Sequence, residues 1–362
     1  MQRAIARELV NHRGPEFREL LHETEELLRP LFGTENRVLF FAASGTGMME
    51  ASLANILAPG DRVLVMKNGQ WGERFAAIAA AYGARVDSLE FPWGTAPDPE
   101  AIGEKLASAH YRAVLITHNE SSTGVVADVA RIGERVRGSD ALLVVDAVSS
   151  LACVEVDQDG WGADIVISAS QKGLMCPPGL GLASVSERAW RVVREERSTP
   201  RFYWDFRKAA AAAEKSETPF TPAISLIGGL REALLMIHQE GVANVLERHA
   251  RLALALRAGC DALGLKSFPE PPAASNSVTA LTVPEGLDGG EIVKTLYRNY
   301  RTVIAGSRNR LAGRVIRIGT MGSVSEADIL ADLHFLAATL NDLESAVDLG
   351  AGVAAGSEML RG

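Results

Sequence analysis

A lysine set among small and apolar residues is the first group in this sequence whose type and setting suggest chemistry. Lys172 follows the largely apolar stretch 163–168, which predicts a buried strand, and precedes two prolines and two glycines that forbid a regular helix. Lysine is rarely buried without a partner. Desolvation in such a place lowers the pKa of the amine and frees it to attack a carbonyl group. Lys172 is therefore a candidate nucleophile, with an ordinary strand-end surface lysine as the alternative.

A glycine turn near the N-terminus is a second candidate site. The apolar stretch 37–42 predicts a strand that runs into Ser44-Gly45-Thr46-Gly47, and a helix is expected from about Met48 to Leu57. Free backbone N–H groups and the positive end of the helix dipole meet at such a turn, which favours a phosphate ligand. An ordinary tight turn is the alternative. The dinucleotide pattern is not met, because Glu50 stands where its third glycine is needed.

Two further predicted strands end in candidate side chains. Trp71 lies in a glycine-flanked loop after the apolar run 62–67, where an indole can stack on a flat ring; a core tryptophan is the alternative. Asp146 closes the apolar run 141–145, which is typical of a parallel strand buried on both faces. Capping a following turn is the other role open to Asp146. The polar stretch 118–124 likewise follows a predicted strand.

The alternation of apolar strands with helices indicates an α/β fold with a mostly parallel, doubly wound sheet. Ligands of such sheets bind at the carboxyl ends of the strands, where the polar residues of this chain gather. Strands and helices after residue 264 predict a second, smaller C-terminal α/β domain. The expected division is an N-terminal arm (1–15), a large domain (16–223), a long connecting helix broken near Gly241 (224–263), the small domain (264–342) and a tail, rich in Ala and Gly, that could be disordered (343–362).

Composition narrows the classes of function. The 362 residues carry a net charge of −8, which argues against nucleic acid as the main partner. The three cysteines, Cys153, Cys176 and Cys260, lie far apart and predict neither a metal site nor a disulfide framework. No apolar run approaches the roughly 20 residues of a membrane helix, and the first residues do not resemble a signal peptide. We therefore expect a cytoplasmic protein.

Taken together, these candidate groups suit one cofactor. Pyridoxal 5'-phosphate has a phosphate, a flat ring, a pyridine nitrogen that works best protonated and an aldehyde that condenses with lysine. Asp146 would pair with the pyridinium and keep it charged, and Lys172 would form the Schiff base and then move the α-proton.

The chain also resembles the class V aminotransferases of fold type I, and within them the serine/alanine–glyoxylate transaminases. The resemblance runs from His12 to about Leu340 through the ordered motifs SGTGMMEASLANILAPGD, NGQWGERF, THNESSTGV, VVDAVSSL, SASQKGLMCPPGLG, PFTPAISLIGGLREAL and RVIRIGTMG. It implies a homodimer with composite active sites. It also implies that Lys172 bonds the cofactor, that Asp146 meets the pyridine nitrogen and that Trp71 stacks on the ring, with Ser121 or Thr123 near the ring hydroxyl. The residues implied to hold the phosphate are Thr46, Gly47, Met48 and Gln171, together with Thr221 of the partner subunit. Arg317 is implied to bind the substrate carboxylate.

The expected activity is transfer of an amino group from a small amino acid, serine or alanine, to a 2-oxo acid such as glyoxylate or pyruvate. Other reactions with the same cofactor are aminophosphonate transamination and cysteine desulfuration. A desulfurase needs a mobile cysteine, and the prolines that follow Cys176 favour a packing role for this thiol instead. A non-catalytic nucleotide-binding α/β protein is the alternative from another class.

Overall fold

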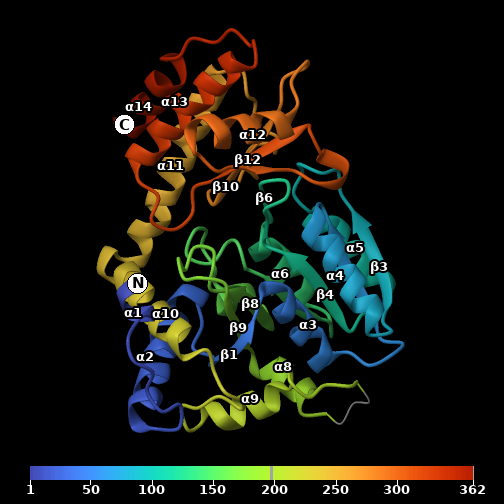
Figure 1. Ribbon diagram of the computed structural model, residues 1–362. Helices are drawn as coiled ribbons and strands as arrows, with labels where there is room; N and C mark the ends of the chain where they lie inside the picture. The colour runs from blue at the N-terminus through green and yellow to red at the C-terminus, as the bar shows by residue number, and fades with distance from the viewer. Residues whose placement is uncertain (196–198, 362) are drawn as a thin grey trace.

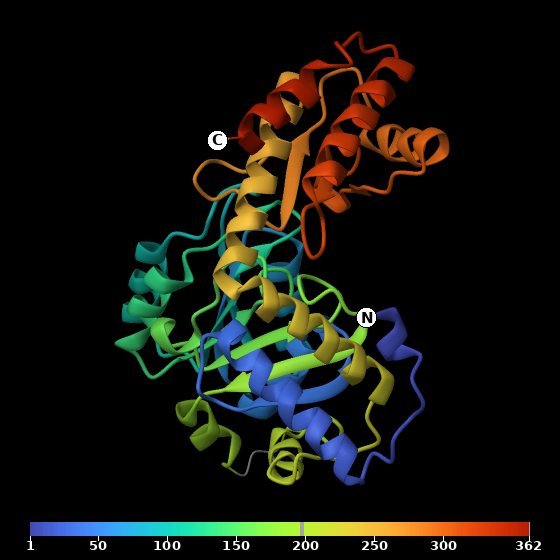
Figure 2. The same cartoon turned by 90° about the vertical axis from the view of Figure 1, so that its left-hand side faces the viewer.

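A computed structural model describes residues 1–195 and 199–361. The chain forms two lobes, a larger one around a central sheet and a smaller one built from the C-terminal third of the chain (Figure 1). The helices α10 (Ile224–Glu240) and α11 (Val242–Ala262) run from one lobe to the other, and Figure 2 shows them as a bent column along the side of the molecule.

The large sheet has seven strands in the order β1-β9-β8-β7-β4-β2-β3. Of these seven, β9 alone runs against the others. The carboxyl ends of β1, β2, β4, β7 and β8 therefore lie at one edge of the sheet. The strands are β1 (Val38–Ala43), β2 (Arg62–Lys67), β3 (Arg85–Glu90), β4 (Ala113–Thr117), β7 (Leu142–Asp146), β8 (Ile165–Ala169) and β9 (Gly179–Val185). The predicted doubly wound, mostly parallel fold is confirmed.

Helices cover both faces of this sheet, and alternate residues of each strand feed two separate cores. In β1, for example, Val38 and Phe40 belong to one core, while Leu39 and Phe41 belong to the other. This is the side-chain alternation of a strand buried on both faces. One core receives α2 (Pro15–Phe32), α5 (Pro99–Ser108), α6 (Val129–Arg137), α7 (Gln158–Trp161) and α10 (Ile224–Glu240); the other receives α3 (Gly45–Ile56), α4 (Gln70–Ala81), α8 (Glu187–Val193) and α9 (Phe206–Ala213).

The small lobe packs helices on a three-stranded antiparallel sheet of order β10-β12-β11. The helix α11 enters it after Gly241, whose φ of 91° interrupts the column at the predicted position. The expectation of a disordered tail is wrong, because residues 351–361 form a helix that packs against α11 and α13. The elements are α11 (Val242–Ala262), β10 (Val278–Thr282), α12 (Gly289–Tyr300), β11 (Ala305–Gly306), η1 (Asn309–Leu311), β12 (Val315–Gly319), α13 (Glu326–Asp342) and α14 (Ala351–Arg361).

Two minor elements complete the description. A short helix, α1 (Gln2–Ile5), packs near α10, and a two-stranded hairpin of β5 (Asn119–Glu120) and β6 (Val125–Val126) follows β4. Within the described residues, none of the helices combines the length and the apolar character that crossing a membrane requires.

Candidate active site

A cavity of about 250 Å³ opens at the carboxyl edge of the large sheet. The loops and helix starts that follow five strands supply its walls, as the parallel topology predicts. Its lining residues are Ser44, Gly45, Thr46, Met49, Trp71, Arg74, Ser121, Asp146, Val148, Ser149, Gln171 and Lys172. The fold thus brings together six of the predicted site residues from distant parts of the sequence.

Lys172 lies on a turn that hydrogen bonds hold closed. The Ser170 hydroxyl donates to the Pro177 carbonyl at 2.7 Å, and the Cys176 N–H donates back to the Ser170 carbonyl at 3.0 Å. Gly173 is required here, since a Cβ atom would lie 2.3 Å from the Leu151 carbonyl oxygen. Burial lowers the pKa of the Lys172 amine, and the positive charge of Arg317 adds to this effect. The predicted stiff turn therefore holds an amine that loses its proton more readily than a surface lysine.

Asp146 ends β7 with its side chain almost fully buried. The Val148 N–H donates to Oδ1 at 2.9 Å, but Oδ2 has no hydrogen-bond partner among the described residues. Burial raises the pKa of Asp146 to about 7, against the lowering effect of the Val148 N–H. A cationic group placed against Oδ2 would reverse this shift.

The phosphate turn differs from its predicted form, because Ser44 caps α3 and the glycine turn is already helical. The Gly47 N–H donates to the Ser44 side chain, and the Met48 N–H donates to the Ser44 carbonyl. Met48 is fully buried, and Met49 lines the cavity instead. The Gly47 and Met48 N–H groups, which the resemblance assigns to the phosphate, are thus bonded within the chain. At this turn, the N–H groups of Gly45 and Thr46 have no hydrogen-bond partner among the described residues.

Trp71 lies in the first turn of α4 and is fixed from two sides. Its indole Nε1 donates to the Ser121 hydroxyl at 2.8 Å, and its backbone N–H donates to Glu120 Oε2, also at 2.8 Å. Glu120 also accepts the Gly72 N–H and thereby caps α4 from the β5–β6 hairpin. Gly69 permits this approach, because a Cβ atom there would lie 2.3 Å from the Glu120 side chain.

Arg317 reaches the site from β12 of the small lobe. Its Nη1 donates to the Ser121 carbonyl at 2.8 Å and its Nη2 to the Gly306 carbonyl at 3.0 Å. Its Nε is buried and has no partner among the described residues. Burial lowers the pKa of Arg317, and the negative charge of Glu120 opposes that shift. The guanidinium thus keeps N–H groups available for an anion.

Of the predicted residues, Thr123 and Thr221 lie outside the lining of the cavity, as do Gly47, Met48 and Arg317. Thr123 is fully buried, and its hydroxyl lies 3.4 Å from the Asn68 carbonyl and 3.3 Å from the Glu120 carbonyl. Of the two alternatives for the ring hydroxyl, the structure therefore presents Ser121. Thr221 is exposed on the loop before α10, beside Phe220, and it does not face the cavity of its own chain.

The sequence reasoning missed two charged residues of the site, Arg74 and Glu120. Arg74 lines the cavity, and Glu120 is a buried acid whose pKa burial raises. Both resemble ordinary surface charges in a sequence. Arg74 did carry a signal, since residues three apart on a helix share a face and Arg74 follows Trp71 by three.

Comparison with known proteins supplies the remaining findings. The family profile described as "Aminotransferase class-V" matches residues 2–327. The soluble hydrogenase 42 kDa subunit of Anabaena cylindrica is 38% identical, covering 98% of this chain and 94% of that protein. The serine–glyoxylate aminotransferase of Methylorubrum extorquens is 36% identical, covering 100% and 92%. The crystal structure of ureidoglycine–glyoxylate aminotransferase from Bacillus subtilis superposes with a TM-score of 0.96 at 32% identity, covering 100% and 94%.

Proposed function

Because this chain belongs to the class V aminotransferases, we propose that it moves an amino group from a small amino acid, serine or alanine, to a 2-oxo acid such as glyoxylate or pyruvate. The membership confirms the family and the enzyme class that the sequence motifs predicted. Glyoxylate stands in the names of both aminotransferases compared above, while their amino donors differ. The observation that carries the proposal is the meeting of Lys172 and Asp146 in one cavity beside the open N-terminus of α3.

The residues present fit pyridoxal phosphate, which the family implies. Gly45 and Thr46 offer unpaired N–H groups at a helix N-terminus, and the Gln171 side chain, whose amide NH2 can donate to an anion, lines the same cavity. Trp71 offers an indole surface, and Asp146 leaves Oδ2 open. When bound, the cofactor supplies an aldehyde that takes up the amino group and a ring that withdraws electrons from the reacting carbon.

Each protein group then has a defined task. The Lys172 amine holds the cofactor aldehyde and afterwards moves the proton at the substrate α-carbon, a role its lowered pKa favours. Asp146 stays ionised against a protonated pyridine nitrogen. Arg317 fixes the substrate carboxylate, since its fork matches two carboxylate oxygens and orients the α-carbon.

Cysteine desulfuration is disfavoured by the setting of Cys176. The thiol is buried, and its Sγ lies 3.4 Å from the Leu226 carbonyl. Burial raises the pKa of Cys176 to about 11, which opposes formation of a thiolate nucleophile.

The homodimer with shared sites remains a proposal. Thr221 is exposed, its loop carries two prolines, and the stacked rings of Phe220 and Tyr203 (centroids 5.2 Å apart) stand beside it. These features suit a rigid hydroxyl offered to a partner's phosphate. Subunits carrying Lys172→Ala would be mixed with subunits carrying Thr221→Trp. Return of activity in the mixed dimers supports shared sites, and absence of recovery in confirmed mixed dimers contradicts them.

The proposed activity has a direct test. The purified protein should be yellow, lose that colour on borohydride treatment, and transfer amino groups in a screen of serine, alanine and other small amino acids against glyoxylate and pyruvate. A colourless protein that binds no added cofactor would overturn the proposal.

A further inference from the structure

Arg74 is placed where the phosphate turn and the indole platform meet. Its Nη1 donates to the Thr46 hydroxyl at 2.7 Å, beside the open N–H groups of α3. Its guanidinium carbon lies 4.3 Å from the centroid of the Trp71 ring. The hydrogen bond and the ring contact together hold the guanidinium in the cavity wall, while the hydrogen bond to Thr46 uses one of its five N–H donors.

A phosphate bound in this cavity needs a positive charge to neutralise it, and Arg74 lies where it can supply one. A phosphate monoester carries about −1.5 to −2 at pH 7, and a helix N-terminus offers only partial positive charge. Among the side chains that line the cavity, Arg74 and Lys172 are the two cations. Lys172 is committed to the aldehyde, and burial lowers its pKa. Arg74 is therefore the lining group left to neutralise a dianion.

We propose that Arg74 is the counter-ion of the cofactor phosphate, bonding one phosphate oxygen while the Thr46 hydroxyl and the Trp71 ring hold it in place. The inference rests on the proposed function, because it names a ligand for that cofactor. Arg74 then contributes to the binding free energy of the cofactor through the phosphate group alone and not through the ring.

The test compares two ligands that cannot bond Lys172 covalently, pyridoxamine 5'-phosphate and pyridoxamine. Their dissociation constants would be measured by titration of the cofactor-free protein, for wild type and for Arg74→Gln. Hydrogen bonds to charged groups are worth about 1.5–3 kcal/mol, so the variant should bind the phosphorylated ligand about 10- to 100-fold more weakly. Its affinity for pyridoxamine should stay within about threefold, a change of less than 1 kcal/mol.

Arg194→Gln is a matched control. Arg194, the C-cap residue of α8, also lies over a tryptophan of that helix, with its guanidinium carbon 5.7 Å from the centroid of the Trp190 ring. It pairs with Glu187, and neither residue lines the cavity. This control should leave both dissociation constants unchanged. Arg74→Lys keeps the charge without the fork, so it should recover part of the loss.

The possible outcomes separate the two proposals. A wild-type protein that does not prefer the phosphorylated ligand overturns the proposed function itself. A wild-type preference that Arg74→Gln retains in full overturns the role of Arg74 alone. If Arg74→Gln fails to fold, Thr46→Val removes the anchor of the guanidinium and should cause a smaller loss restricted to the phosphorylated ligand; an unchanged preference in that variant contradicts the proposal.

Discussion

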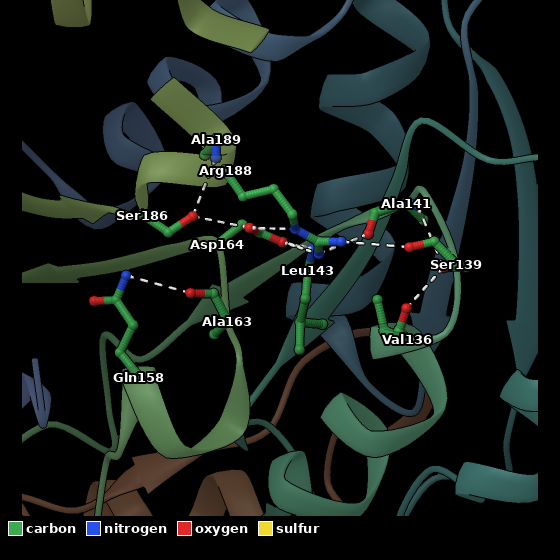
Figure 3. Close-up of polar contacts among 10 residues, drawn as sticks. All are labelled: Val136, Ser139, Ala141, Leu143, Gln158, Ala163, Asp164, Ser186, Arg188 and Ala189. Atoms are coloured by element: carbon green, nitrogen blue, oxygen red, sulfur yellow. Dashed lines mark hydrogen bonds and ion pairs between the residues drawn. The ribbon is translucent and has the colours of Figure 1, made fainter. Parts of the chain in front are cut away.

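Two buried aspartates at opposite ends of neighbouring strands, Asp164 and Asp146, differ in how many hydrogen bonds their carboxylates accept. Asp164 precedes β8 and accepts hydrogen bonds from the Leu143 N–H, the Ser186 hydroxyl and Nε and Nη2 of Arg188. Figure 3 shows this network, in which Arg188 also bonds the carbonyls of Ser139 and Ala141. Both carboxylate oxygens of Asp164 are therefore satisfied from within the chain.

Asp146 ends the neighbouring strand β7 at the other edge and receives one N–H, from Val148. The edge around it also holds the Lys172 amine, the Arg317 Nε and the Gln171 Oε1 without partners among the described residues. Buried polar groups are normally paired, and unpaired ones are costly. The polar groups at the amino ends of the strands therefore stabilise the fold, while those at the carboxyl ends remain unpaired within the described chain and can bind ligands.

The largest expected effect comes from the amine at the ligand edge. Lys172→Ala removes the group that bonds the cofactor and moves the substrate proton, so turnover should fall by about 10⁴-fold. The cofactor should remain bound without a covalent link, which mass spectrometry after borohydride treatment detects. Near-normal turnover would show that Lys172 is not the reactive amine.

Asp146→Asn should lower turnover by about 10²- to 10⁴-fold, because the neutral amide no longer favours a protonated pyridine nitrogen. Steady-state rates, measured with circular dichroism as a check on folding, test this. Rates within a factor of two of wild type would mean that Asp146 only caps the turn at Val148.

Asp164→Asn tests the other half of the comparison. The variant loses charged hydrogen bonds to Arg188, whose side chain is 34% exposed and stays partly solvated, so it should lose about 1.5–3 kcal/mol of unfolding free energy. Denaturant unfolding should show this loss, while the rate per folded molecule stays close to that of wild type. A stable variant with impaired turnover would contradict the separation of the two edges.

Arg317→Lys keeps a positive charge at the ligand edge but loses the bidentate fork. The KM for amino donors should rise about 10- to 100-fold, the worth of one or two charge-assisted hydrogen bonds, with little change in cofactor affinity. If the KM for every donor is unchanged, another group binds the carboxylate.

The last expected effect is a pH dependence of stability in the cofactor-free protein. Burial raises the pKa of Asp146 to about 7, whereas an unfolded aspartate titrates near 3.9. Between these values the folded state binds more protons, so wild-type stability falls as pH rises from about 4 to about 7, by at most about 1.4 kcal/mol per pH unit. Asp146→Asn lacks this titration. As pH rises across that interval, the melting temperature of wild type should therefore fall relative to that of the variant. If the melting temperatures of wild type and Asp146→Asn change equally with pH, the pKa of Asp146 is not raised in the folded protein.

Much of this arrangement could be predicted from local patterns. The run 62–67 coincides with β2, and β4 is the strand predicted before the polar stretch 118–124, because apolar segments bounded by polar residues define buried strands well. Asp146 and Lys172 were found because each closes such a run. The parallel topology then brings them to one edge of the sheet.

The errors arise where a contact distant in sequence, or the exact start of a helix, decides the outcome. Ser44 caps α3, which begins at Gly45 and not at the predicted Met48, so the N–H groups without partners at this turn are those of Gly45 and Thr46. The C-terminal tail forms α14 because Gly352 and Gly356 let it pack closely on α11, which its own composition does not reveal. Glu120 caps a helix 50 residues away, and no local pattern marks such a contact.

Ser121 forms hydrogen bonds with two residues of the site, Trp71 and Arg317, so the evolution of these two residues is linked. Its hydroxyl holds the Trp71 indole, and its carbonyl holds Arg317 from the small lobe. A change that reshapes substrate recognition at Arg317 therefore also disturbs the residue that orients the indole. Contacts that share a partner show non-additive mutational effects. Lineages that acquire a new amino donor by substitution at Arg317 should need compensating substitutions around Trp71, so the order in which such mutations accumulate is constrained.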